Sequence, residues 1–172
     1  MIINNNLFID ILKIIKSDEE CIEVEKEFPA EAFLEFDSSL KLLSAVTFKG
    51  FIKKELGQIF IGGKLTFSME LTCDRCLNTL DNKFCLPFDD IIAKEDCELE
   101  EGEFIPYSNS RVLLTEPIYQ AIFVEATGKH LCSDECKGLC PQCGCNLNEQ
   151  SCNCVTDEID PRFEKLKNLF NI

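Results

Sequence analysis

Hydrophobic and polar residues alternate along much of the first half of the chain, and this pattern predicts β-strands. In residues 64–71, KLTFSMEL, every second side chain is apolar, so one face of the strand would be buried and the other solvated. Shorter alternating runs predict further strands at residues 22–28, 46–52 and 84–88. Turns are predicted at Gly57 and at residues 62–63, because glycine adopts backbone conformations that other residues avoid.

Two later segments have the spacing of amphipathic helices. Residues 116–127, EPIYQAIFVEAT, place Ile118 and Ile122 on one side of a helix, which we expect to cover one face of the sheet. Residues 160–170, DPRFEKLKNLF, predict a C-terminal helix whose apolar stripe is either core packing or a surface for a partner.

These elements predict an α+β fold. A small antiparallel sheet or open β-barrel with a covering helix would be followed by a C-terminal, zinc-ribbon-like cysteine module. We expect a β-rich domain with its helix in residues 1–128, and a metal-binding module with the C-terminal helix packed on it in residues 129–172. The acidic stretch after Phe88 is predicted to be a flexible loop, because it holds little to bury.

The chain is strongly acidic, with a formal net charge of −14 over 172 residues. Such a charge repels phosphate backbones and attracts basic proteins. The acidic residues concentrate in residues 18–37 and 89–103, whereas residues 41–84 hold seven basic residues against four acidic ones. Direct contact with RNA stays open, and the middle segment is where it would occur. The alternative for that segment is a solvated strand face.

The N-terminal apolar segment, Leu7 to Ile15, is interrupted by Asp10 and Lys13 and does not predict a signal peptide. No segment approaches the roughly 20 apolar residues of a membrane span. We therefore expect a cytoplasmic protein. Thiols stay reduced in the cytoplasm, which favours metal binding over the alternative of a secreted disulfide scaffold.

Seven of the twelve cysteines fall between residues 132 and 154, and this density indicates a metal site. CPQCG, residues 140–144, has the form of a zinc knuckle, with two thiols on a tight turn followed by glycine. The CxC pair after a polar spacer would complete a four-thiolate site. The predicted ligands are Cys140, Cys143, Cys152 and Cys154.

A second site is possible, which would bring the chain to one or two structural zinc ions. Cys132 and Cys136 could replace either pair of the first site, or they could join Cys73 and Cys76 in TCDRCL. Spacing alone does not distinguish zinc from iron. A closed four-thiolate site leaves no position for substrate, so its metal would serve folding. The remaining cysteines are predicted to be small buried hydrophobes outside the sites: Cys21, Cys85, Cys97 and Cys145.

Catalysis is not expected from these residues. The single histidine, His130, is predicted to be a surface residue, and no motif for a catalytic serine or cysteine is present. The alternative is a cytosolic thiol-disulfide oxidoreductase that uses Cys73 and Cys76. Against it, Asp74 opposes formation of the Cys73 thiolate, and the pattern lacks the parallel strand that precedes such a motif.

The order of these motifs resembles the YceD family of large ribosomal RNA subunit accumulation proteins. An alternating strand runs into C-x-R-C-L at residues 73–77, and an acidic loop and one helix follow. CKGLCPQCGCNLNE (136–149), CNC (152–154) and DPRFEKLKNL (160–169) complete the pattern. One departure is EATGKHL before Cys132, where the family has a proline-containing apolar segment.

The resemblance implies a role in accumulation or processing of large-subunit ribosomal RNA, hence in ribosome assembly, without known catalysis. A protein this acidic is not expected to coat RNA. We expect its partner to be a basic ribosomal protein or the pre-ribosomal large subunit, with no membrane contact.

Overall fold

The chain forms two compact units in a computed structural model, which describes residues 7–16, 21–96 and 104–154. The first unit consists of residues 1–71 and 79–129, and the second of residues 72–78 and 130–172. The second unit therefore combines two segments that lie far apart in the sequence.

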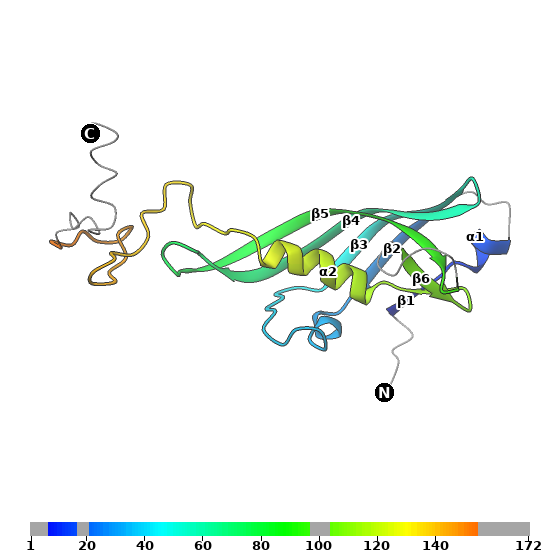
Figure 1. The fold of residues 1–172 in the computed structure, drawn as a ribbon, viewed down its shortest axis with the longest axis horizontal. Helices are drawn as coiled ribbons and strands as arrows, with labels where there is room; N and C mark the ends of the chain where they lie inside the picture. Colours follow the sequence, from blue (N-terminus) through cyan, green and yellow to red (C-terminus); the bar gives the residue numbers. More distant parts are fainter. Residues whose placement is uncertain (1–6, 17–20, 97–103, 155–172) are drawn as a thin grey trace, which may run out of the picture. The chain divides into compact units, whose positions relative to one another are not determined.

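One curved, mixed sheet forms the first unit and gives it the form of a half-barrel (Figure 1). Its strands are β1 (Phe8–Asp10), β2 (Cys21–Phe28), β3 (Val46–Glu55), β4 (Gln58–Thr72), β5 (Thr79–Lys94), β6 (Ile105–Ser108) and β7 (Arg111–Leu113). Their order in the sheet is β1-β7-β6-β5-β4-β3-β2. The pairs β1–β7, β2–β3, β3–β4 and β6–β7 are antiparallel, whereas β5 and β6 are parallel.

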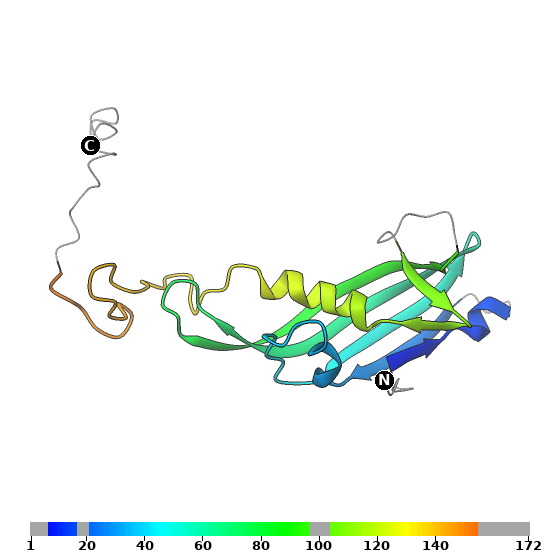
Figure 2. The same cartoon turned by 60° about the horizontal axis from the view of Figure 1, so that its bottom comes forward.

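Three helical segments accompany the sheet: α1 (Leu12–Lys16), the 3-10 helix η2 (Ala30–Phe33) and α2 (Thr115–Ala126). Helix α2 lies over one face of the sheet, beside the loop that contains η2 (Figures 1 and 2). Its side chains Ile118 and Ile122 are fully buried in the core. The predicted α+β fold with a covering helix is confirmed.

The alternation of apolar and polar residues predicted in β4 is present, and its apolar residues form part of the core. Leu65, Phe67 and Met69 are buried on one face of the strand, and the residues between them are half-buried. Phe48 and Phe88 meet edge to face within the core, with ring centroids 5.7 Å apart. Each such buried side chain contributes about 1.5–3 kcal/mol to the folding of the first unit.

The predicted turn at residues 62–63 is wrong, because Gly62 and Gly63 lie inside β4. They pair with Phe51 and Gly50 of β3. A Cβ atom on Gly63 would lie 2.7 Å from the Cα atom of Gly50, and one on Gly50 would lie 2.1 Å from the carbonyl oxygen of Gly62. These glycines permit a close approach of two backbones, which is a common use of glycine in strand interiors. The predicted turn at Gly57 is present.

The flexible loop predicted after Phe88 is wrong in part, because β5 continues to Lys94 and buries Ile92. The two short strands β6 and β7 were not predicted. Residues 97–103 of the acidic stretch and the predicted helix at 160–170 lie outside the described residues. Within the described part of the chain, no helix is long and apolar enough to cross a membrane.

Candidate metal centres

The second unit gathers eight cysteines into two clusters of four. The 73–136 cluster consists of Cys73, Cys76, Cys132 and Cys136, and the 140–154 cluster of Cys140, Cys143, Cys152 and Cys154. Within each cluster all four sulfur atoms lie within 4.8 Å of one another. The structure thus brings together the four residues expected for the main site. It also joins the other two pairs in one of the combinations that their spacing left open.

Both clusters could hold a metal ion such as zinc. Four sulfurs bound tetrahedrally to zinc at about 2.3 Å lie roughly 3.8 Å from one another. In the 73–136 cluster the sulfur atoms of Cys73 and Cys136 are 3.8 Å apart, and those of Cys76 and Cys132 are 3.6 Å apart. Cys73, Cys76 and Cys136 are buried. Four thiolates at these distances would enclose a zinc ion and leave it no open position.

A tight turn positions the first two cysteines of the 73–136 cluster. The backbone N–H of Leu77 donates to the carbonyl oxygen of Cys73 at 2.9 Å, and the N–H of Cys73 donates to the carbonyl of Asn78 at 2.9 Å. Leu77 has a φ of 60°, an unusual conformation for a leucine. The turn brings the sulfur atoms of Cys73 and Cys76 onto one side.

The turn at CPQCG repeats this arrangement in the 140–154 cluster. The N–H of Gly144 donates to the carbonyl of Cys140 at 2.9 Å, and the N–H of Cys140 donates to the carbonyl of Cys145 at 2.8 Å. Gly144 has a φ of 72° at the position that corresponds to Leu77. The two CxxC segments are therefore equivalent knuckles. The spacing of Cys140 and Cys143 in the sequence had predicted the second of these knuckles.

The first cysteine of each knuckle is the one that ionises most easily. Burial alone would raise the pKa of the Cys73 thiol, but backbone N–H groups of Cys76, Arg75 and Cys132 point at its sulfur and together lower its pKa to about 6. The N–H of Cys132 lies 3.3 Å from that sulfur. Donors aimed at a thiolate favour the charged form over the neutral one.

The Cys140 thiol has the same kind of environment. Backbone N–H groups of Cys143 and Gln142 point at its sulfur and lower its pKa to about 6, although burial opposes them. The first cysteine of each knuckle is therefore the one most readily converted to a thiolate. A thiolate is the form of cysteine that binds metal.

Other thiols in the clusters are held in the protonated form. The Cys132 thiol hydrogen-bonds to Cys136 and then to Cys76, which raises its pKa to about 12. The Cys154 thiol hydrogen-bonds to Cys143, with a similar rise to about 12. Four thiolates so close together repel one another, so they can all ionise only when a cation compensates their charge. Metal binding would accordingly release protons.

Arg75 joins the two segments of the second unit. Its guanidinium donates to the carbonyl oxygens of Cys136, at 2.9 Å, and Asp134, at 3.3 Å. Its own carbonyl accepts the N–H of Leu139 at 3.1 Å. A Cβ atom on Gly138, which has a φ of 74°, would lie 3.0 Å from that same carbonyl. The arginine of C-x-R-C and the glycine of CKGLC thus hold the first knuckle against residues 134–139.

Two asparagines of the NLN segment support the 73–136 cluster. The amide nitrogen of Asn148 donates to the sulfur of Cys136 at 3.3 Å, and its side-chain oxygen accepts the N–H of Lys137 at 2.8 Å. The side-chain oxygen of Asn146 accepts the backbone N–H of Asn148 at 3.0 Å. Such outer contacts orient metal ligands. These two roles were not predicted from the sequence, although both asparagines belong to the NLN motif that follows the second knuckle.

Cys145 was predicted to lie outside the sites, and it is not one of the four thiols of the 140–154 cluster, although it lies beside them. Its thiol hydrogen-bonds to Cys143 and lies close to Cys152, and these contacts raise its pKa to about 12. The prediction of buried positions is wrong for Cys21 and Cys85, which are exposed on the sheet. Cys97 lies outside the described residues.

The backbones of Asp74 and His130 connect the first knuckle to the chain after α2. The N–H of His130 donates to the Asp74 carboxylate at 2.7 Å, and the N–H of Asp74 donates to the carbonyl of His130 at 2.9 Å. His130 is half-buried rather than a fully exposed surface residue. Asp74 was expected to oppose formation of the neighbouring Cys73 thiolate. Its carboxylate also has a structural role, because it accepts the N–H of His130.

The chain is similar to proteins of bacteria and of a plant. Uncharacterized proteins of Mycobacterium tuberculosis and Mycobacterium bovis are each 31% identical to it over 98 residues, which are 55% of this chain and 47% of the relative. The chain thus spans about half the length of these curated relatives. The large ribosomal RNA subunit accumulation protein YCED homolog 1, chloroplastic, of Arabidopsis thaliana is 31% identical over 70 residues, which are 41% of this chain and 22% of that protein.

No solved structure matches the chain. The family model described as large ribosomal RNA subunit accumulation protein YceD matches residues 61–170. That range begins in β4, contains α2, and includes all eight cysteines of the two clusters. The chain therefore belongs to the YceD family.

Proposed function

We propose that the protein is a noncatalytic ribosome-assembly factor that supports accumulation or processing of large-subunit ribosomal RNA in the cytoplasm. The observation that carries this proposal is the family match over residues 61–170. The matched range holds the two cysteine clusters and the residues that support them, together with α2 and part of the sheet of the first unit. The Arabidopsis relative carries the same function in its name.

Each cysteine cluster binds one structural zinc ion in this proposal. The sulfur spacing fits a tetrahedral four-thiolate site, and thiolates with no open coordination position suit a folding role. The proposed ligands are the four residues of each cluster. Zinc bound in this way would hold segments 72–78 and 130–154 together and would take no part in chemistry on a substrate.

The partner in this proposal is a basic ribosomal protein or the pre-ribosomal large subunit, engaged through protein contacts. The net charge of −14 favours a basic partner. In the mildly positive middle of the chain, three lysines already form exposed ion pairs with glutamates. They are Lys41 with Glu70, Lys49 with Glu25, and Lys53 with Glu55. These pairs leave less positive charge for an RNA backbone and support the solvated-face interpretation.

The experiment that tests the function removes the gene from its host and measures the ratio of large-subunit to small-subunit ribosomal RNA. We expect the ratio to fall, and to recover when the full chain is supplied. An unchanged ratio contradicts the assembly role. Tight, salt-insensitive binding of the purified protein to naked large-subunit RNA would instead contradict action through protein contacts.

The second candidate is a thiol-disulfide oxidoreductase, and the lowered pKa of Cys73 is the observation that favours it. Two observations weigh against it. The Cys73 side chain is fully buried, and its sulfur lies 3.8 Å from that of Cys136 in a cluster of four thiols. Reduction of insulin disulfides by the wild-type protein, lost in Cys73→Ser, would support the oxidoreductase. We expect neither protein to reduce insulin.

A further inference from the structure

The outward face of α2 and the loop after η2 carry aromatic side chains that are exposed or only half-buried. Phe123 is 44% exposed, and Phe36, from the loop after η2, is 42% exposed. Tyr119 lies between them and stacks on Phe36, with ring centroids 5.0 Å apart and an interplanar angle of 16°. The rings of Tyr119 and Phe123 are 5.8 Å apart. Clustered exposed rings of this kind mark interaction sites more often than single exposed residues do.

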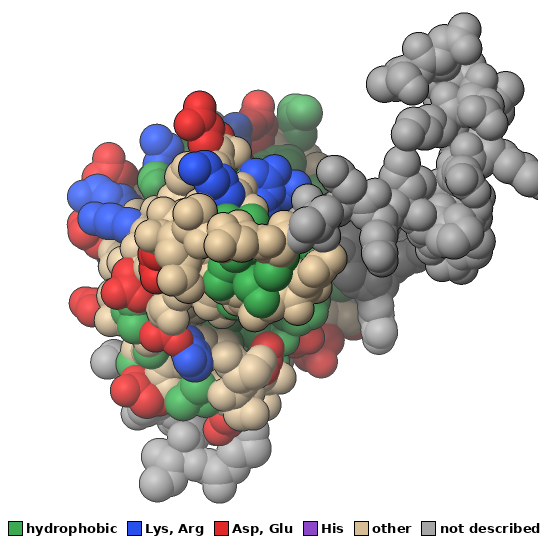
Figure 3. Space-filling model, turned by 90° about the vertical axis from the view of Figure 1, so that its left-hand side faces the viewer, with side chains coloured by type: hydrophobic (Ala, Val, Ile, Leu, Met, Phe, Trp, Pro, Cys, Tyr) green, Lys and Arg blue, Asp and Glu red, His purple; other side chains and the backbone are tan. Residues whose placement is uncertain are grey.

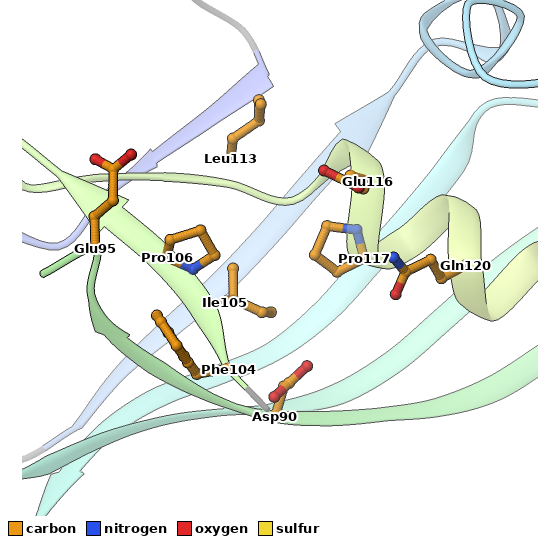
Figure 4. Close-up of a pocket in the computed structure, with 9 residues that line it drawn as sticks. All are labelled: Asp90, Glu95, Phe104, Ile105, Pro106, Leu113, Glu116, Pro117 and Gln120. Carbon is orange, nitrogen blue, oxygen red and sulfur yellow. The ribbon is translucent and has the colours of Figure 1, made fainter. Parts of the chain in front are cut away.

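The helical spacing places this aromatic cluster and a pocket on the same side of α2. Glu116, Gln120 and Phe123 follow one another at i, i+4 and i+7, and all three are exposed, whereas Ile118 and Ile122 on the opposite side are buried. Glu116 and Gln120 also line a pocket of about 380 Å³ in the first unit (Figure 4). One continuous face of the helix therefore joins the two features.

The pocket combines carboxylates with an apolar floor. Asp90 of β5 and Glu116 of α2 face it from two elements, and Glu95 lies at its other side (Figure 4). Ile105 and Pro117 form part of the apolar lining. Asp90 is half-buried, and burial raises the pKa of its carboxyl above the usual value. A long cationic side chain, with an apolar stem and a charged end, matches this combination of groups.

The elements that form the aromatic cluster carry only acidic charge. Residues 29–37, PAEAFLEFD, contain Glu31, Glu35 and Asp37 and no basic residue, and α2 contains Glu116 and Glu125 and no basic residue. Elsewhere the surface is mixed. Figure 3 shows a face of the molecule on which basic side chains gather in the upper part of the view among acidic ones. The purely acidic character of the aromatic surface is therefore local.

We propose that this acidic aromatic surface, formed by α2 and the loop after η2, docks a basic amphipathic segment of a protein partner. Apolar side chains of the partner pack on Phe36, Tyr119 and Phe123, and a lysine or arginine enters the pocket beside Glu116. Aromatic faces also attract the cations of such a segment. This inference rests on the proposed function, because it locates the contact that the assembly factor makes with its basic partner.

The test measures binding of a fluorescent synthetic peptide that carries Lys and Arg on one helical face and Leu and Phe on the other. Oligolysine of equal charge and a single-stranded RNA are the comparison probes. We expect the full-length protein to bind the amphipathic peptide more tightly than oligolysine. The double variant Phe36→Ser/Phe123→Ser should weaken binding at least about tenfold, which is the size of effect that central aromatic contacts give.

Charge variants test the surface without altering its aromatic packing. Glu35→Gln and Glu116→Gln together should weaken peptide binding and reduce its salt dependence. The matched controls lie in the same unit, away from this surface. They are Leu56→Ser, at a fully exposed leucine in the β3–β4 turn, and Asp81→Asn, at an exposed position of β5. We expect the controls to change peptide affinity less than about twofold.

Several results would overturn the proposal. Equal peptide affinity in the wild type and in both sets of variants would contradict it. A loss of peptide affinity in the controls as large as in the variants would also contradict it, because it would show attraction by net charge alone. Loss of RNA binding in place of peptide binding would assign the surface to nucleic acid. A concentration-dependent dimer that Phe36→Ser/Phe123→Ser abolishes would assign it to a second copy of the chain.

The same variants separate this inference from the proposed function. If the double variant loses the peptide but still restores the ribosomal RNA ratio in the gene-deleted host, the surface does not serve assembly and the function stands. If gene deletion leaves the ratio unchanged, the proposed function fails whatever the peptide measurement gives.

Discussion

Removal of the proposed zinc ions should unfold the second unit and leave the first unit intact. In the described part of the second unit, the buried apolar side chains are all cysteines: Cys73, Cys76, Cys136 and Cys140. Burial of these small side chains contributes about 1 kcal/mol each. Burial on this scale is too small to offset the conformational entropy that the two segments lose on folding, so apolar burial alone cannot maintain this unit. A structural zinc site supplies on the order of 10 kcal/mol.

Amide hydrogen exchange resolves this effect residue by residue. After chelation of the metal, we expect protection to disappear at the backbone amides of Cys73 and Cys140, which close the two knuckles. Protection should persist at the amide of Leu65 in β4, whose side chain is buried in the core of the first unit. Cys140→Ser should reproduce the loss in its own knuckle. Cys85→Ser, which changes an exposed cysteine on β5, is the matched control and should have no effect.

Unchanged protection of residues 72–78 and 130–154, in protein shown by elemental analysis to be free of metal, would refute this reasoning. It would mean that hydrogen bonds such as those of Arg75 hold the unit without an ion. Simultaneous loss of protection in both units would refute the independence of the first unit.

Three further outcomes follow from the knuckles. Leu77→Gly should stabilise the second unit by about 1 kcal/mol in chemical denaturation, because glycine relieves the left-handed conformation, whereas Asn78→Gly should not. Zinc binding should weaken as the pH falls, because zinc must displace the protons of the thiols with raised pKa values, and it should weaken more steeply below about pH 6, where Cys73 and Cys140 are protonated as well; zinc retained after dialysis across a pH series measures this. Zinc affinity that is constant below pH 6 would contradict it. Cys145→Ser should keep the full zinc content by elemental analysis, and a loss of one ion would make Cys145 a ligand.

The parts of the fold that local patterns determine were predicted from the sequence. The alternation in residues 64–71 identified β4, and the spacing of Ile118 and Ile122 identified α2, because burial on one face imposes each period. Residues 62–63 misled the prediction. Glycine in a sequence indicates freedom of the backbone, but here it permits contact with Gly50 on the neighbouring strand, and only the register of the sheet reveals that contact.

The candidate site could be predicted only as far as the spacing of cysteines allows. The CPQCG knuckle was visible, but whether Cys132 and Cys136 would meet Cys73 and Cys76 depends on contacts over more than fifty residues. Arg75 provides such contacts by binding the carbonyl of Cys136. The proposed domain boundary between residues 128 and 129 stays a prediction about folding.

The most direct test of the account is the metal content of the purified full-length chain, measured by elemental analysis. Two closed four-thiolate sites predict two zinc ions per chain. Protein that contains no zinc, a single zinc, or iron in its place would contradict the claim that both cysteine clusters are structural zinc sites.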